Sequence, residues 1–498
     1  MRNKGYVTVF LSIMLVVMLI ISTAVIHVVD ISGAKTKSVT AVRSATSNEL
    51  ANYNRFIFDR YHILLLDSDA GGRGQGALEE EMTELLKENL GEDYQISDVE
   101  MSGQVGLMDD DLSEFKKQIN DNFIYDAADY GVNEILDKTN GNDKPVSDET
   151  LNEVDNDIAN EKEEIEKQES EKKKEESAED DDSQREADEA EKERMRKEAA
   201  EAKDPRDELK VYKDAGLAKM LLPEDAELSE NIADMSILPS AGKGSETTEA
   251  VDTDFKSLDR MKLDTGKNTG WGKNLATEGE ALIYARKYFN SLTDQKYQDT
   301  YLNLEKEYLV AGKDNDGANF NEVVDEILLI RFAVNFVCII KDSVKMSECG
   351  LLAALLIWFF PPLQPVVKYL LAGCWAYIES IADVYLMVRG HKIPYIKDST
   401  TWVTDMESLS HLDDYLDEPS DEESGLGYDD YLTILMALKG DVLYYRMLDL
   451  MQMNASMEGV QGSDTSFRMK NAITVFGVNA TVVYKGKEFD IYEEAGYE

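Results

Sequence analysis

The side chains best suited to metal binding or redox chemistry are few in this sequence and widely spaced. Zinc sites need cysteines and histidines at short spacings, such as C-x2-C or H-E-x-x-H. The three cysteines are 11 and 25 residues apart, and the four histidines are equally dispersed: Cys338, Cys349 and Cys374; His27, His62, His391 and His411. We therefore predict no metal site and buried free thiols, with a Cys349–Cys374 disulfide as the alternative.

Two acidic clusters have the oxygen atoms that calcium prefers. Asp314-Asn315-Asp316-Gly317 matches part of an EF-hand loop, in which the sixth position is glycine. With Gly317 at that position, the first and twelfth positions are Gly312 and Val323, which carry no carboxylate. Asp109-Asp110-Asp111 instead precedes a predicted helix, where an aspartate N-cap is favoured, with calcium binding as the alternative.

Motifs for phosphate binding and nucleophilic catalysis are also missing from the sequence. Gly72-Arg73-Gly74-Gln75-Gly76 lacks the lysine and hydroxyl residue of a phosphate-binding loop, and no G-x-S-x-G occurs. No catalytic pair of carboxylates can be singled out among 99 aspartates and glutamates. We predict that the protein is not an enzyme and uses no cofactor, and we identify no small-molecule substrate.

The charge balance limits the class of partner. The 498 residues include 52 Lys and Arg against 99 Asp and Glu, so the formal net charge is −47. An acidic protein without a basic patch repels the phosphate backbone of nucleic acids. Nucleic-acid binding is therefore not expected.

The element with the clearest signal is an uncharged apolar run of 23 residues, 7–29. At 1.5 Å per residue, a helix of this length crosses a hydrocarbon core of about 30 Å. Arg2 and Lys4 precede the run, so residues 1–6 are predicted to be a cytoplasmic leader and the body to lie outside a single-pass cell-membrane anchor. A cleaved secretory signal is the competing interpretation, although its apolar region is usually only about 7–15 residues.

The segment after the anchor, 30–140, is predicted to contain an extended helix followed by α/β structure. Apolar residues recur every three or four positions from Val39 to Tyr61, which favours a largely continuous helix through Arg60. A second amphipathic helix is predicted over 78–90, and weak alternation near 94–105 predicts strand structure.

An acidic low-complexity insertion and linker is predicted over 141–254. Between residues 151 and 210 most positions are charged, and apolar residues are too sparse for a heptad seam. Pairs such as Glu163 and Lys167 favour helix at i, i+4 spacing. We expect a single fluctuating helix or disorder rather than a coiled coil.

The remaining segment, 255–498, is predicted to be a mainly helical domain ending in strands. Helical periodicity is clear at 279–288 and 322–340, while 374–388 is apolar around Glu379 and Asp383 and is typical of a buried hairpin helix. Residues 350–367 are a candidate second membrane crossing, interrupted by prolines.

The fold class that follows is α+β, mainly helical, with a small sheet. The β-branched alternation of 472–484 predicts a kinked strand or a tight pair, with Gly477 near its middle. We expect this segment to pair with the strand near 94–105, which would close a sheet across the acidic insertion.

The N-terminus resembles that of a type IV prepilin or pseudopilin. A short basic leader, Lys4-Gly5, the aromatic Tyr6 and a long apolar helix carry the resemblance. It implies cleavage by a prepilin peptidase between Gly5 and Tyr6 and packing of the new N-terminal helix into a filament. Most pilins have a glutamate five residues into the mature chain, and this sequence has Phe10 there.

A second resemblance covers most of the chain. The elements GYVTVFLS, NRFIFDRYHILLLD, GLMDDDLSEFKKQI, DEILLIRFAVNF and GYDDYLTILMALKGDVLYYRMLDLMQ resemble an uncharacterised envelope domain family of Gram-positive bacteria. Members of that family are often encoded beside tight-adherence (Tad) pilus machinery. The resemblance implies an association with pilus assembly and carries over no catalytic residue.

These observations favour a membrane-anchored, extracytoplasmic structural or assembly protein. Its expected partners are the membrane and pilus or pilus-assembly proteins. An anchored binding or sensing ectodomain without a filament role is the alternative, and an anchored hydrolase is a third.

Overall fold

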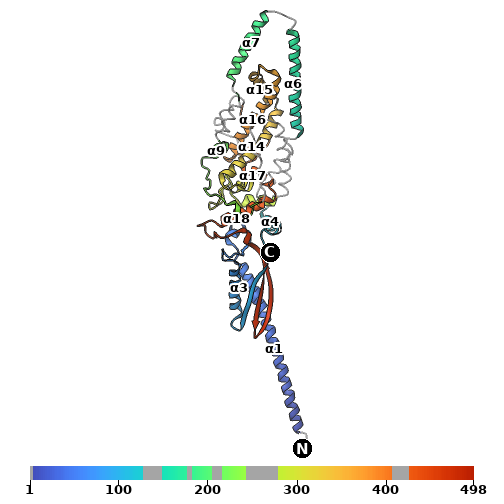
Figure 1. The fold of residues 1–498 in the computed structure, drawn as a ribbon, viewed down its shortest axis with the longest axis vertical. Coiled ribbons are helices and arrows are strands. Elements are labelled where there is room, and N and C mark those ends of the chain that lie inside the picture. Colours follow the sequence, from blue (N-terminus) through green and yellow to red (C-terminus); the bar gives the residue numbers. More distant parts are fainter. Residues whose placement is uncertain are drawn as a thin grey trace. The chain divides into compact units, whose positions relative to one another are not determined.

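The computed structural model describes residues 4–126, 148–176, 182–202, 204, 216–242, 279–405 and 425–497. Their contacts divide the chain into two compact units. Figure 1 draws the chain as a ribbon coloured along the sequence. Unit 1 combines residues 1–122 with 451–498, and unit 2 is the intervening segment 123–450. The chain is mainly helical with one small antiparallel sheet, as the sequence predicts.

Unit 1 begins with α1 (Lys4–Leu50), a helix of 47 residues. It ends ten residues before the predicted end at Arg60, so the prediction of one continuous helix is wrong. The chain turns at 51–54, and α2 (Arg55–Tyr61) then starts with the Asn54 side chain accepting a hydrogen bond from the Ile57 amide. Asparagine is a favoured N-cap, and it restarts the helix in a new direction without glycine or proline.

The sheet of unit 1 joins segments from the two ends of the sequence. Its strands are β1 (Leu66–Asp67), β2 (Tyr94–Gly106), β3 (Ala472–Tyr484) and β4 (Lys487–Gly496). The central strand is β3, which pairs antiparallel with the other three. The predicted pairing of the segments near 94–105 and 472–484 is confirmed.

Gly477 does not kink β3 or split it into a pair. A side chain there would overlap the ring of Tyr492 on β4, since a Cβ atom would lie 2.5 Å from the Tyr492 hydroxyl oxygen. The two residues are diagonal neighbours, offset by two positions in the register, because Gly477 pairs with Glu494 and Asn479 with Tyr492. Glycine in this strand therefore provides space for a cross-strand aromatic ring.

The core of unit 1 lies between the sheet and two helices. One helix is the second half of α1, and the other is α3 (Gln75–Leu90), which buries Leu78, Met82, Leu86 and Leu90. From α1 the core receives small residues at helical spacing: Ala34, Ala41, Val42 and Ala45. Phe476 on β3 is fully buried in this cluster. The remaining described helix of unit 1, α4 (Ser113–Asp126), follows the short 3-10 turn Asp110–Leu112.

Unit 2 is helical in its described part. Its main helices are α12 (Gly279–Tyr288), α13 (Glu305–Ala311), α14 (Asp316–Lys341), α15 (Ser343–Leu356), α16 (Gln364–Met387), α17 (Tyr428–Ala437) and α18 (Asp441–Ala455). Helix α16 packs against both α14 and α15 and is buried along most of its length. The helices predicted at 279–288, 322–340 and 374–388 are all present.

Residues 350–367 do not form one helix. Helix α15 ends at Leu356, a 3-10 turn covers Pro361–Leu363, and α16 begins at Gln364. By length and apolar composition the residues 361–387 could cross a membrane, but 89% of their most apolar window is buried inside the protein. The hairpin therefore supplies core helices of unit 2, and the turn between them leaves Phe359 and Phe360 exposed.

The highly charged part of the acidic insertion forms two long described helices, where one fluctuating helix or disorder was expected from the sequence. They are α6 (Asp148–Glu176) and α7 (Asp182–Glu201). Helix α6 packs against α16 through Val154, which is 1% exposed, and Glu161 pairs with Lys368 at 2.7 Å. Helix α6 also contacts the Pro361–Leu363 turn, and most of its other described residues are exposed.

Candidate functional site

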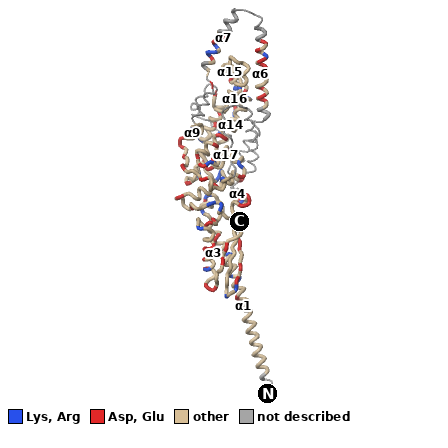
Figure 2. The backbone as a smooth tube through the Cα atoms, in the orientation of Figure 1, with Lys and Arg blue, Asp and Glu red and all other residues tan. Residues whose placement is uncertain are grey.

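The first half of α1 is an exposed apolar surface. Every residue from Tyr6 to Val29 is exposed, and the most apolar window of this helix has no buried residue. Figure 2 shows that this stretch carries no charged side chain. Tyr6 is 82% exposed and Phe10 is 65% exposed, so both sequence-predicted site residues lie on this surface, and Gly5 lies in the first turn of the same helix. A long exposed apolar helix of this kind is a signal sequence or a membrane anchor.

The apolar surface ends where the turn between β3 and β4 contacts α1. The Tyr484 hydroxyl donates to Asp30 Oδ1 at 3.0 Å, and Lys485 Nζ donates to Asp30 Oδ2 at 2.7 Å. These hydrogen bonds lower the pKa of Asp30 and keep its carboxylate charged. Further along α1, Arg43 pairs with Glu493 on β4 at 3.2 Å. The sheet thus contacts α1 from Asp30 onward, and the helical turns of α1 before Asp30 are exposed.

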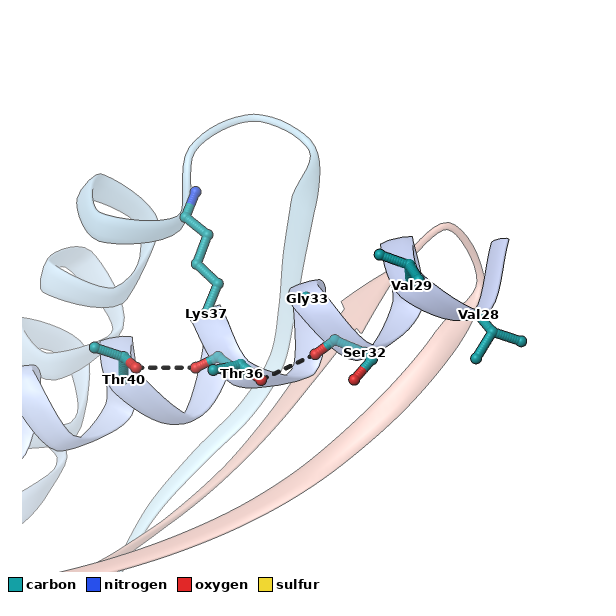
Figure 3. A pocket seen from close by; sticks show the side chains of 7 residues that line it. All are labelled: Val28, Val29, Ser32, Gly33, Thr36, Lys37 and Thr40. Carbon is teal, nitrogen blue, oxygen red and sulfur yellow. Dashed lines mark hydrogen bonds between the residues drawn. The ribbon is translucent and has the colours of Figure 1, made fainter. Parts of the chain in front are cut away.

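A shallow groove of about 690 Å³ runs along α1 beside this boundary (Figure 3). Its polar groups are already used: Thr36 donates to the Ser32 carbonyl and Thr40 to the Thr36 carbonyl, both at 3.0 Å. Lys37 extends away and donates to the Leu90 carbonyl at 2.7 Å. No convergent set of free polar groups faces the groove from these side chains, so it lacks the features of a small-molecule site.

Unit 2 contains a cluster of four buried charged side chains that were not predicted from the sequence to lie together. The residues are Arg331 on α14, Glu379 and Asp383 on α16, and Lys397 in the segment that follows α16. Arg331 donates to Asp383 Oδ2 through Nε at 2.9 Å and lies 2.8 Å from it through Nη2. Lys397 Nζ contacts Glu379 Oε1 and lies 2.6 Å from Asp383 Oδ1. We call these four residues the buried charge cluster.

The buried charge cluster holds the chain segment 393–404 over the helical hairpin. Arg331 Nη1 donates to the Pro394 and Tyr395 carbonyls, and the Glu379 carboxylate accepts hydrogen bonds from the Val403 and Thr404 amides. Burial alone would raise the pKa of Asp383, but Arg331 and Lys397 hold it below its ordinary value. Burial alone would lower the pKa of Lys397, but Asp383 and Glu379 hold it above its ordinary value.

A second buried carboxyl has no compensating cation of this kind. Glu307 on α13 is fully buried, its Oε1 accepts from the Leu292 amide at 2.9 Å, and its Oε2 meets no hydrogen-bond partner among the described residues. Burial raises the pKa of Glu307 to about 8, and burial with the nearby Glu307 charge raises the pKa of Tyr428. Glu307 is therefore protonated in the folded protein at neutral pH.

Stability should fall as the pH rises through the folded pKa of Glu307. The folded pKa, about 8, is above the ordinary value of 4.5. The contribution of Glu307 to the free energy of unfolding is therefore complete below pH 4.5, falls as the pH rises, and is lost above pH 8. Between these pH values the free energy of unfolding of Glu307→Gln should increase relative to that of the wild type by up to about 1.4 kcal/mol per pH unit. Urea unfolding at several pH values measures this, with Glu280→Gln at an exposed position of α12 as the control. Parallel pH profiles for wild type and Glu307→Gln would contradict the assignment.

The acidic and sulfur-containing candidates from the sequence have structural roles. All three cysteines are free, so the alternative of a Cys349–Cys374 disulfide is wrong. Asp109 accepts a hydrogen bond from the Gly106 amide, Asn315 caps α14 and Asp316 accepts from the Asn303 amide. Within the described ranges no three Asp, Glu, His or Cys residues could hold a metal ion together. His411 lies outside the described residues.

The sequence carries a partial signal for the buried charge cluster. Glu379 and Asp383 stand out as acids in an apolar segment, and Arg331 is a single cation in the run ILLIRFAVNF. Charged residues are almost never fully buried unless they are paired. Pairing Arg331 with Asp383 would have followed from packing the two apolar helices together. Lys397 gives no such signal, because it follows the helix in an irregular segment.

The structure defines an α+β, mainly helical protein that carries a long exposed apolar N-terminal helix. The chain belongs to the family of unknown function DUF5702, whose model matches residues 195–484, more than half of the chain. No curated protein and no solved structure matches it. The matched range includes the buried charge cluster and β3 and begins after α1.

Proposed function

We propose that this protein is a pseudopilin-like assembly component of the cell envelope, associated with a Tad-type pilus. In this proposal, α1 is a single-pass anchor with a cytoplasmic N-terminus and an extracytoplasmic body. The observation that carries it is the division of α1 into a bare apolar half, 6–29, and a half built into the core of an antiparallel sheet.

This division couples the membrane segment to the folded body. The uncharged stretch 7–29 spans about 34 Å as a helix, which matches the hydrocarbon core. No break separates it from the packed half, because α1 is one helix from Lys4 to Leu50. A partner that binds the apolar half in the membrane would therefore orient the sheet of unit 1 directly.

Phe10 favours an accessory role over that of a repeating filament subunit. In the pilins that the N-terminus resembles, a glutamate at this position neutralises the amino terminus of a neighbouring subunit in an apolar environment. A charge in such an environment is costly unless it is paired, and an aromatic ring cannot pair it. A component present in one or a few copies needs no such repeated contact.

The N-terminal peptide of the protein extracted from its native membranes tests the proposal. Mass spectrometry should find a chain that starts at Tyr6, and Gly5→Leu should shift the start to Met1 by blocking cleavage. Gly33→Ala is the matched control, because this glycine lies on the same helix with nothing within 4 Å of an added Cβ. A wild-type chain that starts at Met1 would favour an anchored binding or sensing ectodomain, and a start beyond Val29 would refute the anchor.

A further inference from the structure

The buried charge cluster places one amine against two carboxyl groups in the protein interior. Lys397, Glu379 and Asp383 are at most 5% exposed, and Glu379 and Asp383 are one helical turn apart on the same face of α16. Trp402 covers the amine, with the Lys397 Nζ atom 5.7 Å from the ring centroid. Water is thereby kept from the three functional groups.

The two carboxyl groups have different environments. Asp383 Oδ2 accepts from both Arg331 and Asn335, the latter at 2.8 Å, so Asp383 is an anion before the reaction. Besides the Lys397 ammonium, Glu379 accepts from neutral donors: the Val403 amide at 2.9 Å on Oε1, and the Thr404 amide at 2.8 Å and Thr404 Oγ1 at 2.7 Å on Oε2. Trp375 Nε1 donates to Thr404 Oγ1 at 3.0 Å, which directs the threonine proton toward Glu379.

We propose that Lys397 and Glu379 condense in the folded protein to form an intramolecular amide between Nζ and Cδ. The arrangement provides an acyl donor (Glu379), a nucleophile (Lys397), a base (Asp383) and hydrogen-bond donors for a developing oxyanion. Fixed donors aimed at such an oxygen are the main source of rate enhancement in acyl transfer. The inference is independent of the proposed function.

The reaction is balanced and needs no other reactant. A proton first passes from the Lys397 ammonium to the Glu379 carboxylate that it touches, which gives a neutral amine and a neutral acid. The amine attacks Cδ, Glu379 Oε2 becomes the oxyanion, and the Thr404 amide and hydroxyl stabilise it. Asp383 accepts one Nζ proton and returns it to the departing hydroxyl, which leaves as water. One C–N bond forms, one C–O bond breaks, and Asp383 ends as the carboxylate paired with Arg331.

The state after condensation has fewer buried charges. Before it, two cations and two anions are buried together, and the desolvation of each is costly. Afterwards only Arg331 and Asp383 remain charged, and two guanidinium nitrogens of Arg331 contact Asp383 Oδ2, so that the remaining charges stay paired.

Intact mass measurement of the denatured, detergent-extracted full chain tests the proposal. We expect most chains to be lighter than the sequence mass by one water molecule. Trypsin should leave Lys397 uncut and yield a branched peptide that joins 369–389 to 393–439. Lys397→Met should restore the unmodified mass. Lys306→Met is the matched control and should still be lighter than its sequence mass by one water molecule. Lys306 is also buried between two carboxylates, but one of them, Asp294, is 40% exposed, so no condensation is expected there.

The wild-type measurement decides the matter even if a variant does not fold. A wild-type chain at full mass, cut by trypsin after Lys397, would overturn the proposal and leave the cluster purely ionic. Asp383→Asn separates the roles within the cluster, because it keeps both condensing groups and removes the base. Folded Asp383→Asn protein should show a strongly reduced condensed fraction, and an undiminished fraction would refute the catalytic role of Asp383.

Discussion

Replacing Arg331 with Met should lower the free energy of unfolding of unit 2 by about 3–5 kcal/mol, because it leaves Asp383 as a buried charge without its main partner. Arg331 is fully buried and also donates to the Pro394 and Tyr395 carbonyls. These acceptors lose their partner in the variant, and a buried unpaired acceptor adds to the cost. Urea unfolding of wild type and variant measures the difference.

The same type of substitution at a solvated ion pair provides the control. Lys313 lies 3.6 Å from Glu322 in unit 2, with both side chains partly exposed, so Lys313→Met should cost less than about 1 kcal/mol. A double variant, Arg331→Met with Asp383→Leu, should recover part of the loss because it removes the unpaired charge as well. Equal stabilities for Arg331→Met and Lys313→Met would show that the buried charge cluster does not stabilise unit 2.

Phe476→Ala should destabilise unit 1 by about 3–5 kcal/mol, the usual cost of the cavity left by a deleted core phenylalanine. Phe476 is fully buried on the central strand, in the cluster that joins the sheet to α1 and α3. The variant should therefore also loosen α1 from the sheet. Hydrogen exchange should speed up over 34–49 and over β3, while 6–29 stays as in the wild type.

Phe359→Ala is the matched control for this prediction. Phe359 is 69% exposed, and surface substitutions usually change stability by no more than about 0.5 kcal/mol. If the two variants unfold at the same denaturant concentration, the proposed packing of α1 on the sheet is wrong.

Periodicity was a reliable guide where an element has one buried face. It predicted the pairing of β2 with β3, because inward residues such as Val99, Met101 and Val478 alternate with exposed ones. It did not predict β4, in which only Phe489 and Ile491 are buried apolar residues and acidic side chains fill half of the other positions. Apolar alternation over so short a stretch is too weak to recognise.

Periodicity failed where the chain changes direction without interrupting the helical spacing of its apolar residues. Tyr53, Ile57 and Tyr61 continue the helical spacing of α1, yet the chain turns at 51–54 and Asn54 starts a new helix. The candidate site shows the same limit. The apolar surface of α1 follows from composition alone, whereas the buried charge cluster depends on tertiary packing between α14, α16 and the segment that follows them.

The position of β3 imposes an order on biosynthesis. Its partner β2 is synthesised first, and the whole of 123–450 must follow before β3 leaves the ribosome. At translation rates of about 5–20 residues per second, β2 waits on the order of tens of seconds with an unpaired edge, which is a hazard for aggregation. Unit 1 therefore has a high contact order and completes its fold only after translation of unit 2, which would make it the slower unit to fold.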